Sequence, residues 1–479
     1  MLFNSLEFAL FLFLVSIFYF IAPFRLRTFL LVIASYIFYM YWRWEYIFLL
    51  VAQTGINFGC GWAISRSNSQ RNRSLWLACS IVSSLGILFL LKYYNFFLNA
   101  LGVVIPALST NSAIAGMHIA VPIGISFYTL QAVGYTIDVY QRKIDHENDP
   151  VHFALFVGFF PQILSGPIER AGNMLKQFRQ KNTFDLDRIY SGLTLMLWGL
   201  FKKVVIADRL AIYVNLVYND PQGFSGPTLL LATYFFAFQI YCDFSGYSDM
   251  AIGAARILGY DLMANFRLPY FADSISDFWR RWHISLSTWF RDYLYIPLGG
   301  NRISLFRRQA NILVVFAVSG LWHGANWTFI VWGILHGFYY LLEKVFGGVA
   351  ARFSSVFRVN KALLKGCRIF IIFHLVTLAW VFFKARSVTD ALYVLKGIFT
   401  NFEGPLYLGP SQLTTVIGAV SILLLIAVQF LQYRDLIPLT KAEAKLSFPV
   451  YVRWPVLASM IFGISIFGVS SNEFIYFQF

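Results

Sequence analysis

Apolar runs about as long as a lipid bilayer is thick recur along the whole chain, and they constrain the fold more than any other feature. Leu6–Ala22, Leu75–Leu98 and Leu413–Leu431 are three of them. A helix crosses the hydrocarbon core with roughly 20 apolar residues, and only helices and closed barrels satisfy their backbone groups in lipid. Hydrophobic residues make up 58% of the chain and charged residues 13%, which excludes an ordinary soluble domain. We therefore predict an all-α integral membrane protein.

The length of 479 residues leaves room for a bundle of roughly 10–12 transmembrane helices. No interval of soluble-domain size and no tandem repeat interrupts the apolar pattern, so we expect a single membrane-embedded domain over residues 1–479. The run Val151–Gly166 is short and contains a proline, which favours a re-entrant or tilted segment. Lys202 and Lys203 separate two further short runs, Ser191–Leu200 and Val204–Val217. Two helices are expected after Gly226, ending in the polar stretch Tyr241–Met250.

Basic residues gather in short segments between the spans and predict the topology. Arg25 and Arg27 are the first positive charges and follow the first apolar run, so the positive-inside rule places the N-terminus outside the cytoplasm. Basic loops are expected again at Arg302–Arg308 and Lys344–Arg368. The formal net charge of +15 is thus explained by topology and by contact with anionic lipid, and not by nucleic-acid binding. The same cytoplasmic excess could attract the phosphates of coenzyme A.

Residues 265–337 place three of the seven histidines and several charged residues in a chain otherwise built for lipid. An ionisable group at the bilayer centre costs roughly 2.5–3.5 kcal/mol on insertion scales, so such groups are the first candidates for a site. His323 lies between two apolar runs, next to Gly320, Gly324 and Asn326. We expect it at a break in a hydrophobic hairpin, beside a helix N-terminus whose dipole favours neutral imidazole. A neutral histidine facing a cavity can act as a general base.

The default interpretation of a histidine in an apolar helix is a hydrogen-bonded packing residue, and we keep it for His336. That residue follows His323 by 13 positions, about 220° round a continuous helix. Residues Asp273–Tyr295 are expected to form one helix, opened by a capping box at Ser274–Asp277. Its periodicity gives the helix one aromatic face and a separate basic face. The aromatic face holds Trp279, Trp282, His283, Leu286 and Phe290, and the basic face holds Arg280, Ser287 and Arg291.

Asp243 and Asp249 are six residues apart and are not neighbours on one helix face. Pairing with Arg280, Arg281 or Arg291, or capping, is the expected role, and no metal pair follows from the spacing. The cysteines show no paired spacing and predict neither a disulfide framework nor a zinc site. They are Cys60, Cys79, Cys242 and Cys367.

Long motifs in this region resemble the signature of the membrane-bound O-acyltransferase (MBOAT) family, closest to its bacterial alginate O-acetylation (AlgI-like) branch. They are FWRRWHISLSTWFRDYLYIPLGGNR at Phe278–Arg302 and GLWHGANWTFIVWGILHG at Gly320–Gly337. Shorter matching pieces lie upstream, at Pro122–Tyr140, Phe159–Ile168, Lys202–Asp208 and Tyr241–Gly253. The signature core therefore spans about residues 118–345, and the match becomes loose after about Val345.

The resemblance implies a bundle with re-entrant and short helices around a central funnel or tunnel. It implies that His323, in the WHG motif, is the catalytic candidate and that His283 is the second polar residue of the reaction centre. We hypothesise that Arg280, Arg281, Trp279 and Arg291 contact the acyl donor near the CoA phosphates. The donor would be acetyl-CoA, used as a substrate, with no tightly bound cofactor and no metal.

The same resemblance implies a multi-pass protein of the bacterial inner membrane that passes acetyl from the cytoplasm to an exported polysaccharide. Alginate, cellulose and peptidoglycan are candidate acceptors, and SGNH-hydrolase-like O-acetyltransferases are expected extracytoplasmic partners. Two alternatives remain open. One is D-alanyl transfer to teichoic acid, as in DltB-like relatives. The other is a non-enzymatic transporter or flippase, since broken apolar segments and buried charge also suit a midplane binding site.

Overall fold

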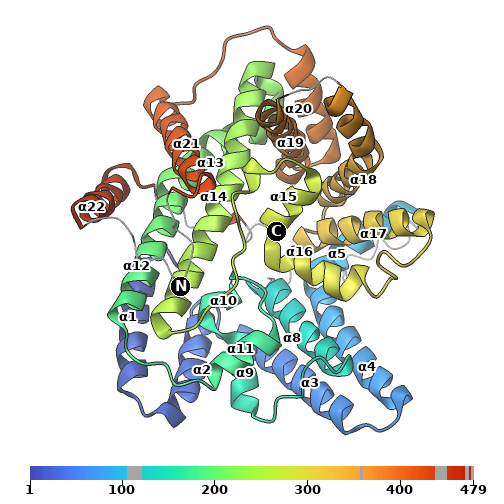
Figure 1. Ribbon diagram of the computed structural model, residues 1–479, viewed down its shortest axis with the longest axis vertical. Helices are drawn as coiled ribbons and strands as arrows, with labels where there is room; N and C mark the ends of the chain where they lie inside the picture. Colours follow the sequence, from blue (N-terminus) through green and yellow to red (C-terminus); the bar gives the residue numbers. More distant parts are fainter. Residues whose placement is uncertain (105–120, 165, 357–359, 437–449, 470–473, 476–479) are drawn as a thin grey trace. The chain divides into compact units, whose positions relative to one another are not determined.

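The computed structural model describes residues 1–104, 121–164, 166–356, 360–436, 450–469 and 474–475. Within these ranges helices are the only regular secondary structure, which confirms the all-α prediction. The uncharged loop before Met117 and the start of the predicted segment from His118 lie outside the described residues. Figure 1 shows these helices with their labels.

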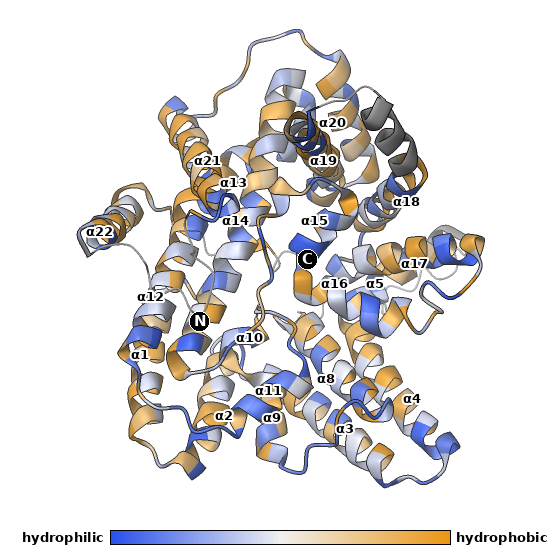
Figure 2. Ribbon diagram, in the orientation of Figure 1, coloured by the Kyte–Doolittle hydropathy of each residue, from blue (hydrophilic) through white to orange (hydrophobic). Residues whose placement is uncertain are grey.

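Seven helices in the described residues are long and apolar enough to cross a membrane. They are Tyr46–Arg66, Gln70–Gly102, Leu186–Asn219, Gly226–Leu258, Trp327–Phe346, Lys361–Lys384 and Gln412–Tyr433. Three shorter apolar helices accompany them, Leu6–Ile21, Pro150–Ile163 and Tyr451–Phe467. Large apolar side chains are exposed along several of these helices, for example Phe13 and Leu423, and Figure 2 shows α21 (Gln412–Tyr433) as mostly hydrophobic. Such surfaces suit lipid. A multi-pass membrane protein is therefore confirmed, while the number of 10–12 spans stays a prediction.

The chain divides into two compact units. Unit 1 comprises Met1–Leu193 and Ala251–Met263, and unit 2 comprises Thr194–Met250 and Ala264–Phe479. The prediction of one membrane domain is not tested by this division, and each unit is described by itself.

Unit 1 contains the N-terminal helices, several of which are held together by buried polar side chains. Its elements are α1 (Leu6–Ile21), α2 (Phe24–Met40), α3 (Tyr46–Arg66), α4 (Gln70–Leu88), η1 (Phe89–Tyr93), α5 (Tyr94–Val104), α8 (Ile125–Tyr140), α9 (Pro150–Gly158), α10 (Phe160–Ile163) and α11 (Ala171–Phe178). Asn57 on α3 donates to Ser84 on α4 at 2.9 Å and accepts from Ser80 at 2.7 Å. It also accepts from Thr136 on α8 at 3.1 Å. Such interhelical hydrogen bonds stabilise helix pairs in lipid.

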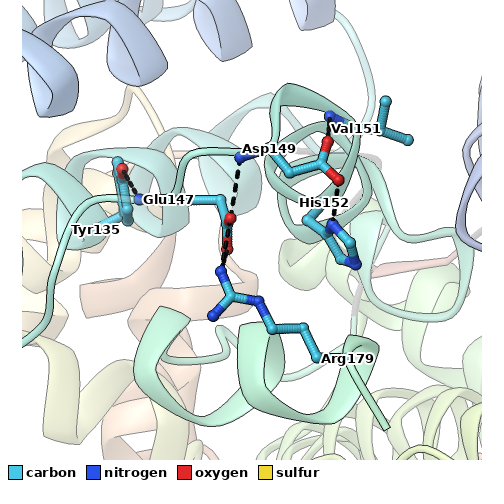
Figure 3. A network of polar contacts seen from close by, with 6 residues as sticks. All are labelled: Tyr135, Glu147, Asp149, Val151, His152 and Arg179. Atoms are coloured by element: carbon cyan, nitrogen blue, oxygen red, sulfur yellow. Dashed lines mark hydrogen bonds and ion pairs between the residues drawn. The ribbon is translucent and has the colours of Figure 1, made fainter. Parts of the chain in front are cut away.

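The loop from α8 to α9 is fixed by a second polar network (Figure 3). The buried Glu147 carboxylate accepts from Arg179 at 2.7 Å and from the backbone N–H of Asp149 at 3.0 Å. The Glu147 N–H donates to the Tyr135 hydroxyl at 3.0 Å. Asp149 caps α9 by accepting from the Val151 N–H at 2.8 Å. After α9, the backbone leaves helical geometry at Phe159 before α10, so this run is interrupted. The re-entrant or tilted placement of Val151–Gly166 stays a prediction.

Unit 2 contains the long helices that surround the predicted reaction centre. Its elements are the end of α12 (Leu186–Phe201), η2 (Lys202–Ala207), α13 (Asp208–Asn219), η3 (Pro221–Gly223), most of α14 (Gly226–Leu258), η4 (Pro269–Phe271), α15 (Ile275–Arg281), α16 (Ile284–Phe290), η5 (Arg291–Tyr295), α17 (Leu305–His323), α18 (Trp327–Val356), α19 (Lys361–Lys384), α20 (Val388–Thr400), α21 and α22 (Val450–Phe467). The expected basic loop at Lys344–Arg368 is largely helical, because α18 extends through Lys344 and α19 begins at Lys361.

Lys202 and Lys203 do not separate two helices, and the predicted interruption there is wrong. They lie in a π-helical turn, η2, that joins α12 to α13 as one 34-residue segment. The lysines are tolerated because carboxylates neutralise them inside unit 2. Lys203 Nζ lies 2.7 Å from Asp208 and 2.7 Å from Asp243, and Lys202 Nζ lies 2.7 Å from Asp249.

These ion pairs also correct the predicted partners of Asp243 and Asp249, which were the arginines 280, 281 and 291. The lysines pair with these carboxylates because the π-helical turn inserts an extra residue and directs both ammonium groups toward α14. Since both carboxylates are paired, α14 continues without a break through Tyr241–Met250, and the expected pair of helices is a single helix of 33 residues.

Candidate functional site

His323 is the last residue of α17, and the chain leaves helical geometry at Gly324 before α18 begins at Trp327. The predicted break in an apolar hairpin is therefore confirmed. Asn326 caps α18 by accepting from the Thr328 N–H at 3.0 Å. The two helices approach closely because glycines face each other's backbone. A Cβ on Gly320 would lie 2.1 Å from the Phe329 carbonyl oxygen.

The expected position of His323 relative to the helix dipole is wrong. His323 ends α17, where the macrodipole is negative, and the positive end of α18 begins four residues later. The helix dipole therefore does not favour a neutral His323 ring, contrary to the prediction. Sequence alone does not fix a helix end to within one or two residues.

His283 lies at a second break, because the predicted helix Asp273–Tyr295 is interrupted. The backbone of His283, at the junction of α15 and α16, is in the left-handed region, with φ 42° and ψ 54°. The break is held by Asn265, whose carbonyl oxygen accepts from the Ile284 N–H at 3.0 Å. The Asn265 side-chain oxygen accepts from the Ser285 hydroxyl at 2.7 Å. A non-glycine residue in this region is uncommon, and such conformations concentrate at functional sites.

The two histidine rings come together in unit 2, with centroids 6.3 Å apart. Trp322 packs against both rings, 6.0 Å from His283 and 5.0 Å from His323. Phe244 contacts His283 edge-on at 4.7 Å. Trp332 and Phe383 contact His323 at 5.1 and 5.3 Å. Burial in these surroundings lowers the pKa of His283 to about 3, so its imidazole is neutral near pH 7. We refer to His283 and His323 as the histidine pair.

His336 packs as expected, but the expected hydrogen bond is wrong, because neither ring nitrogen has a hydrogen-bond partner among the described residues. It is fully buried on α18, stacks on Phe278 at 5.9 Å, and contacts Trp279 and Trp332 edge-on at 5.1 and 5.0 Å. These aromatic rings connect α15 with α18. His336 thus packs beside the histidine pair, with Trp332 between His336 and His323.

A cavity of about 400 Å³, the arginine pocket, brings together three of the four residues predicted to contact an acyl donor. Trp279, Arg280 and Arg291 line it, and Arg281 does not. Arg281 pairs with Asp277 at 2.6 Å, one helical turn away on α15. The two pocket arginines are also near carboxylates, since Arg280 lies 3.6 Å from Asp277 and Arg291 lies 2.8 Å from Asp292. The rest of the wall is largely apolar. It includes the α17 residues Ile312, Val315, Phe316 and Ser319.

These α17 residues recur at helical spacing, so the arginine pocket follows one face of the helix. Ser319 lies one turn before His323 on that face. The pocket therefore runs along α17 toward the histidine pair.

A second cavity, of about 650 Å³, begins where α17 ends and has a polar wall. We call it the polar pocket. It is formed by the C-terminal turn of α13, the break between α17 and α18, and the turn between α19 and α20. Its polar side chains are Asn215, Asn219, Asn326, Thr328, Lys384 and Arg386. Phe383 lines this pocket and also contacts His323, so the ring separates the two.

The sequence analysis missed the polar pocket. One signal was present, since Lys384 and Arg386 end the apolar run Ile369–Phe383. The asparagine pair Asn215 and Asn219 at a spacing of four was a second signal, because such residues share a helix face. That α13 and the α19–α20 turn meet beside Gly324 follows only from the tertiary structure.

The histidine pair is buried at two helix breaks of a multi-helix membrane protein, and a cavity lies on each side of it. The family model of the membrane-bound O-acyltransferase family matches residues 141–387, more than half of the chain. The chain belongs to this family, and the resemblance found in its motifs is confirmed.

Curated relatives support the same assignment, three of them over most of the chain. A probable alginate O-acetylase AlgI from Azotobacter vinelandii is 36% identical over 96% of each chain. The protein of that name from Pseudomonas aeruginosa is 39% identical over 80% of this chain and 71% of its own. A peptidoglycan O-acetyltransferase from Helicobacter pylori is 38% identical over 77% of this chain and 73% of its own. A teichoic acid D-alanyltransferase from Bacillus subtilis is 31% identical over 45% of this chain and 56% of its own.

Proposed function

We propose that this membrane acyltransferase is an O-acetyltransferase that takes acetyl from cytoplasmic acetyl-CoA and delivers it across the membrane to a hydroxyl of an exported polysaccharide. The observation that carries the proposal is the position of the histidine pair, between the arginine pocket along α17 and the polar pocket beyond the end of α17. The O-acetylase and O-acetyltransferase relatives, which match most of the chain, support the acetyl group as cargo.

The arginine pocket suits the acyl donor. Arg280 and Arg291 are exposed at its wall, where guanidinium groups can bind phosphate bidentately. Trp279, Leu286 and Phe316 offer an apolar surface to the thioester arm. In this arrangement the CoA phosphates contact the arginines, and the arm extends along α17 toward Ser319 and His323.

The histidine pair suits acyl transfer from a thioester to a hydroxyl. His323 accepts the hydroxyl proton as the oxygen attacks the thioester carbonyl, and the C–S bond breaks as the ester C–O bond forms. The departing CoA thiolate takes up the proton. Neutral His283 can donate a ring N–H to the developing oxyanion, a contribution that preorganised donors make in dry sites. General acid–base catalysis contributes typically about 10²–10⁴ in rate.

The distribution of basic residues supports transfer across the membrane. Arg307 and Arg308 lie in the first turn of α17, and Lys361 begins α19. Lys344 lies near the end of the apolar span Trp327–Phe346 of α18, remote from the break. Positive residues mark the cytoplasmic side. The polar pocket is built from the opposite ends of these helices, so it opens outside while the arginine pocket extends toward the cytoplasm. The same rule supports an N-terminus outside the cytoplasm. The bacterial inner membrane and SGNH-like partner enzymes are part of the proposal because the bacterial O-acetylase relatives favour them.

The test is CoA thiol release from acetyl-CoA by purified protein in proteoliposomes, with and without candidate acceptors and partners. His323→Ala should lose roughly 10²–10⁴ in rate while keeping its elution profile in detergent. His374→Ala is the matched control, because His374 hydrogen-bonds Tyr234 at 2.7 Å outside the histidine pair. Full turnover by His323→Ala would remove this residue from the mechanism.

D-alanyl transfer remains the alternative within the family, because a D-alanyltransferase is 31% identical to this chain. It has less support than acetyl transfer, because that match covers less than half of the chain. A donor requirement for a carrier-bound thioester, with acetyl-CoA inert, would favour it. Substrate flux without any thioester cleavage would favour the transporter hypothesis.

A further inference from the structure

We propose that a groove between α14, α19 and α21 binds one anionic phospholipid of the cytoplasmic leaflet, with an acyl chain in the groove and the phosphate beside Lys365. We call it the lipid groove. It shares no lining residue with the arginine pocket or the polar pocket. The proposal is independent of acetyl transfer, and only the choice of leaflet uses the positive-inside rule.

The lipid groove has a volume of about 540 Å³ and lies within unit 2. On α19 its lining residues are Gly366, Ile369, Phe370 and Phe373, and on α21 they recur at helical spacing from Ala419 to Gln429. The groove therefore follows one face of each helix. At 1.5 Å per residue these faces extend over about 10–15 Å, close to half the thickness of a hydrocarbon core of about 30 Å. The groove thus has the depth of a single leaflet.

The wall of the lipid groove offers few polar groups to a ligand. Most lining residues are aromatic or aliphatic, and three carry polar groups that hydrogen-bond to protein. The three pairs are Tyr234 with His374 at 2.7 Å, Tyr270 with the Ala237 carbonyl oxygen at 2.5 Å, and Gln429 with the Tyr241 hydroxyl at 2.6 Å. At the rim, Phe370 and Leu423 are 64% and 65% exposed, a surface that suits lipid. A hydrocarbon chain fits this wall, whereas a sugar or a nucleotide needs polar partners.

Lys365 marks the end of the lipid groove from which a headgroup would emerge. It precedes the lining residue Gly366, and its Nζ lies 5.0 Å from the centroid of the Tyr433 ring. Tyr433 in turn stacks on the lining residue Phe271 at 5.2 Å. The start of α19, the end of α21 and the residues after η4 therefore meet at this end.

This end of the groove carries an excess of positive charge. Its exposed basic side chains in residues 360–368 and 430–436 are Lys361, Lys365, Arg368 and Arg434. Two carboxylates accompany them: Asp273, which interacts electrostatically with Lys365, and Asp435, which follows Arg434. The described cations outnumber the carboxylates by two, so the charge at this end is only partly neutralised.

An anionic phospholipid uses both features of the site. Its chain fills the apolar groove, and its phosphate joins Lys365 and the neighbouring cations. Each Lys or Arg near the surface attracts anionic lipid by about fivefold in affinity. A zwitterionic lipid would fill the groove without using the excess charge, and a soluble phosphate would use the charge without the groove.

The test counts the lipids that the full chain retains from mixed micelles with equal amounts of phosphatidylglycerol and phosphatidylcholine, by native mass spectrometry. We expect one phosphatidylglycerol to be retained at least about tenfold more than phosphatidylcholine, with the preference falling as salt is added. Lys365→Gln should lower the preference by about fivefold. Lys396→Gln, which neutralises an exposed lysine of α20 outside the groove, is the matched control and should leave it unchanged.

A second variant tests the groove itself. Ala419→Phe fills it and should remove the retained lipid, whereas Val420→Phe adds the same bulk at a neighbouring position that is 58% exposed and outside the groove. The unfolding midpoint in SDS identifies variants that fold.

Equal retention of the two lipids by the unaltered chain, or a preference that survives Lys365→Gln, would overturn the anionic site. Full retention by folded Ala419→Phe would overturn the groove as its position. Displacement of phosphatidylglycerol by acetyl-CoA would also overturn the proposal, in favour of a site for soluble phosphates.

Discussion

Lys203, Asp208 and Asp243 form a buried cluster of charges. Removing one carboxylate should cost several kcal/mol in stability, because water cannot replace it around the buried Lys203 ammonium. Lys203 is 1% exposed, and Asp208 and Asp243 are each 3% exposed. Each carboxylate lies 2.7 Å from the lysine nitrogen. At an effective dielectric constant near 20, each pair attracts by about 6 kcal/mol before desolvation is subtracted. Breaking one buried pair typically costs about 3–5 kcal/mol in net stability.

We therefore expect Asp243→Ala to lower the free energy of unfolding by about 3 kcal/mol, the lower end of that range, because Asp208 remains to pair Lys203. Lys203→Met should cost at least as much, since it leaves two carboxylates buried side by side. Replacing all three residues by apolar ones of similar volume should restore most of the loss. Asp243 also accepts from the Ile475 N–H at 2.7 Å, and that hydrogen bond is lost in every variant of Asp243.

The assay is unfolding by SDS titration in mixed micelles, followed by tryptophan fluorescence. Glu403→Ala removes an exposed carboxylate and serves as the control. Loss of less than about 1 kcal/mol in Asp243→Ala, a value typical of exposed ion pairs, would refute the view that the cluster is buried and paired.

Three further outcomes follow from the structure. Gly320→Leu should abolish activity and lower the unfolding midpoint, because its Cβ would lie 2.1 Å from the Phe329 carbonyl, whereas Gly366→Ala, with no atom within 4 Å, should change neither. Arg280→Gln should raise KM for acetyl-CoA by roughly tenfold with kcat unchanged, and a lower kcat at constant KM would contradict donor binding. The pH–rate profile should show no inflection from His283 above pH 5, because burial lowers its pKa to about 3. A shift of the profile in His283→Asn would show that the ring titrates in that range.

Apolar length and glycine placement made the membrane helices and the break after His323 predictable from the sequence. Both depend on local chemistry, since a run of apolar residues has to be helical in lipid and a Gly-x-Asn sequence ends one helix and caps the next. The break at His283 was not predictable, because its capping box and helical periodicity favour a continuous helix. The contacts of Asn265 with the residues after His283 overcome that local preference.

Charge pairing was the weakest part of the sequence prediction. Asp243 and Asp249 were assigned to the arginines of the following signature motif. The structure pairs them with two lysines that were predicted to interrupt a helix. A π-helical turn has no simple sequence signature, and it decides which way Lys202 and Lys203 point. The sequence also grouped Arg281 with the donor-binding arginines, but Arg281 lies outside the arginine pocket and pairs with Asp277 on its own helix.

The central claim is that the histidine pair transfers acetyl from a donor on the basic side of the membrane to the side on which the polar pocket opens. Membrane vesicles of both orientations test it most directly, with labelled acetyl-CoA added outside, because acetyl-CoA does not cross an intact bilayer. The account predicts CoA release by inverted vesicles, in which the cytoplasmic side faces out, little release by right-side-out vesicles, and none by His323→Ala in either. Equal release by right-side-out vesicles, or release by inverted vesicles that persists in His323→Ala, would contradict it.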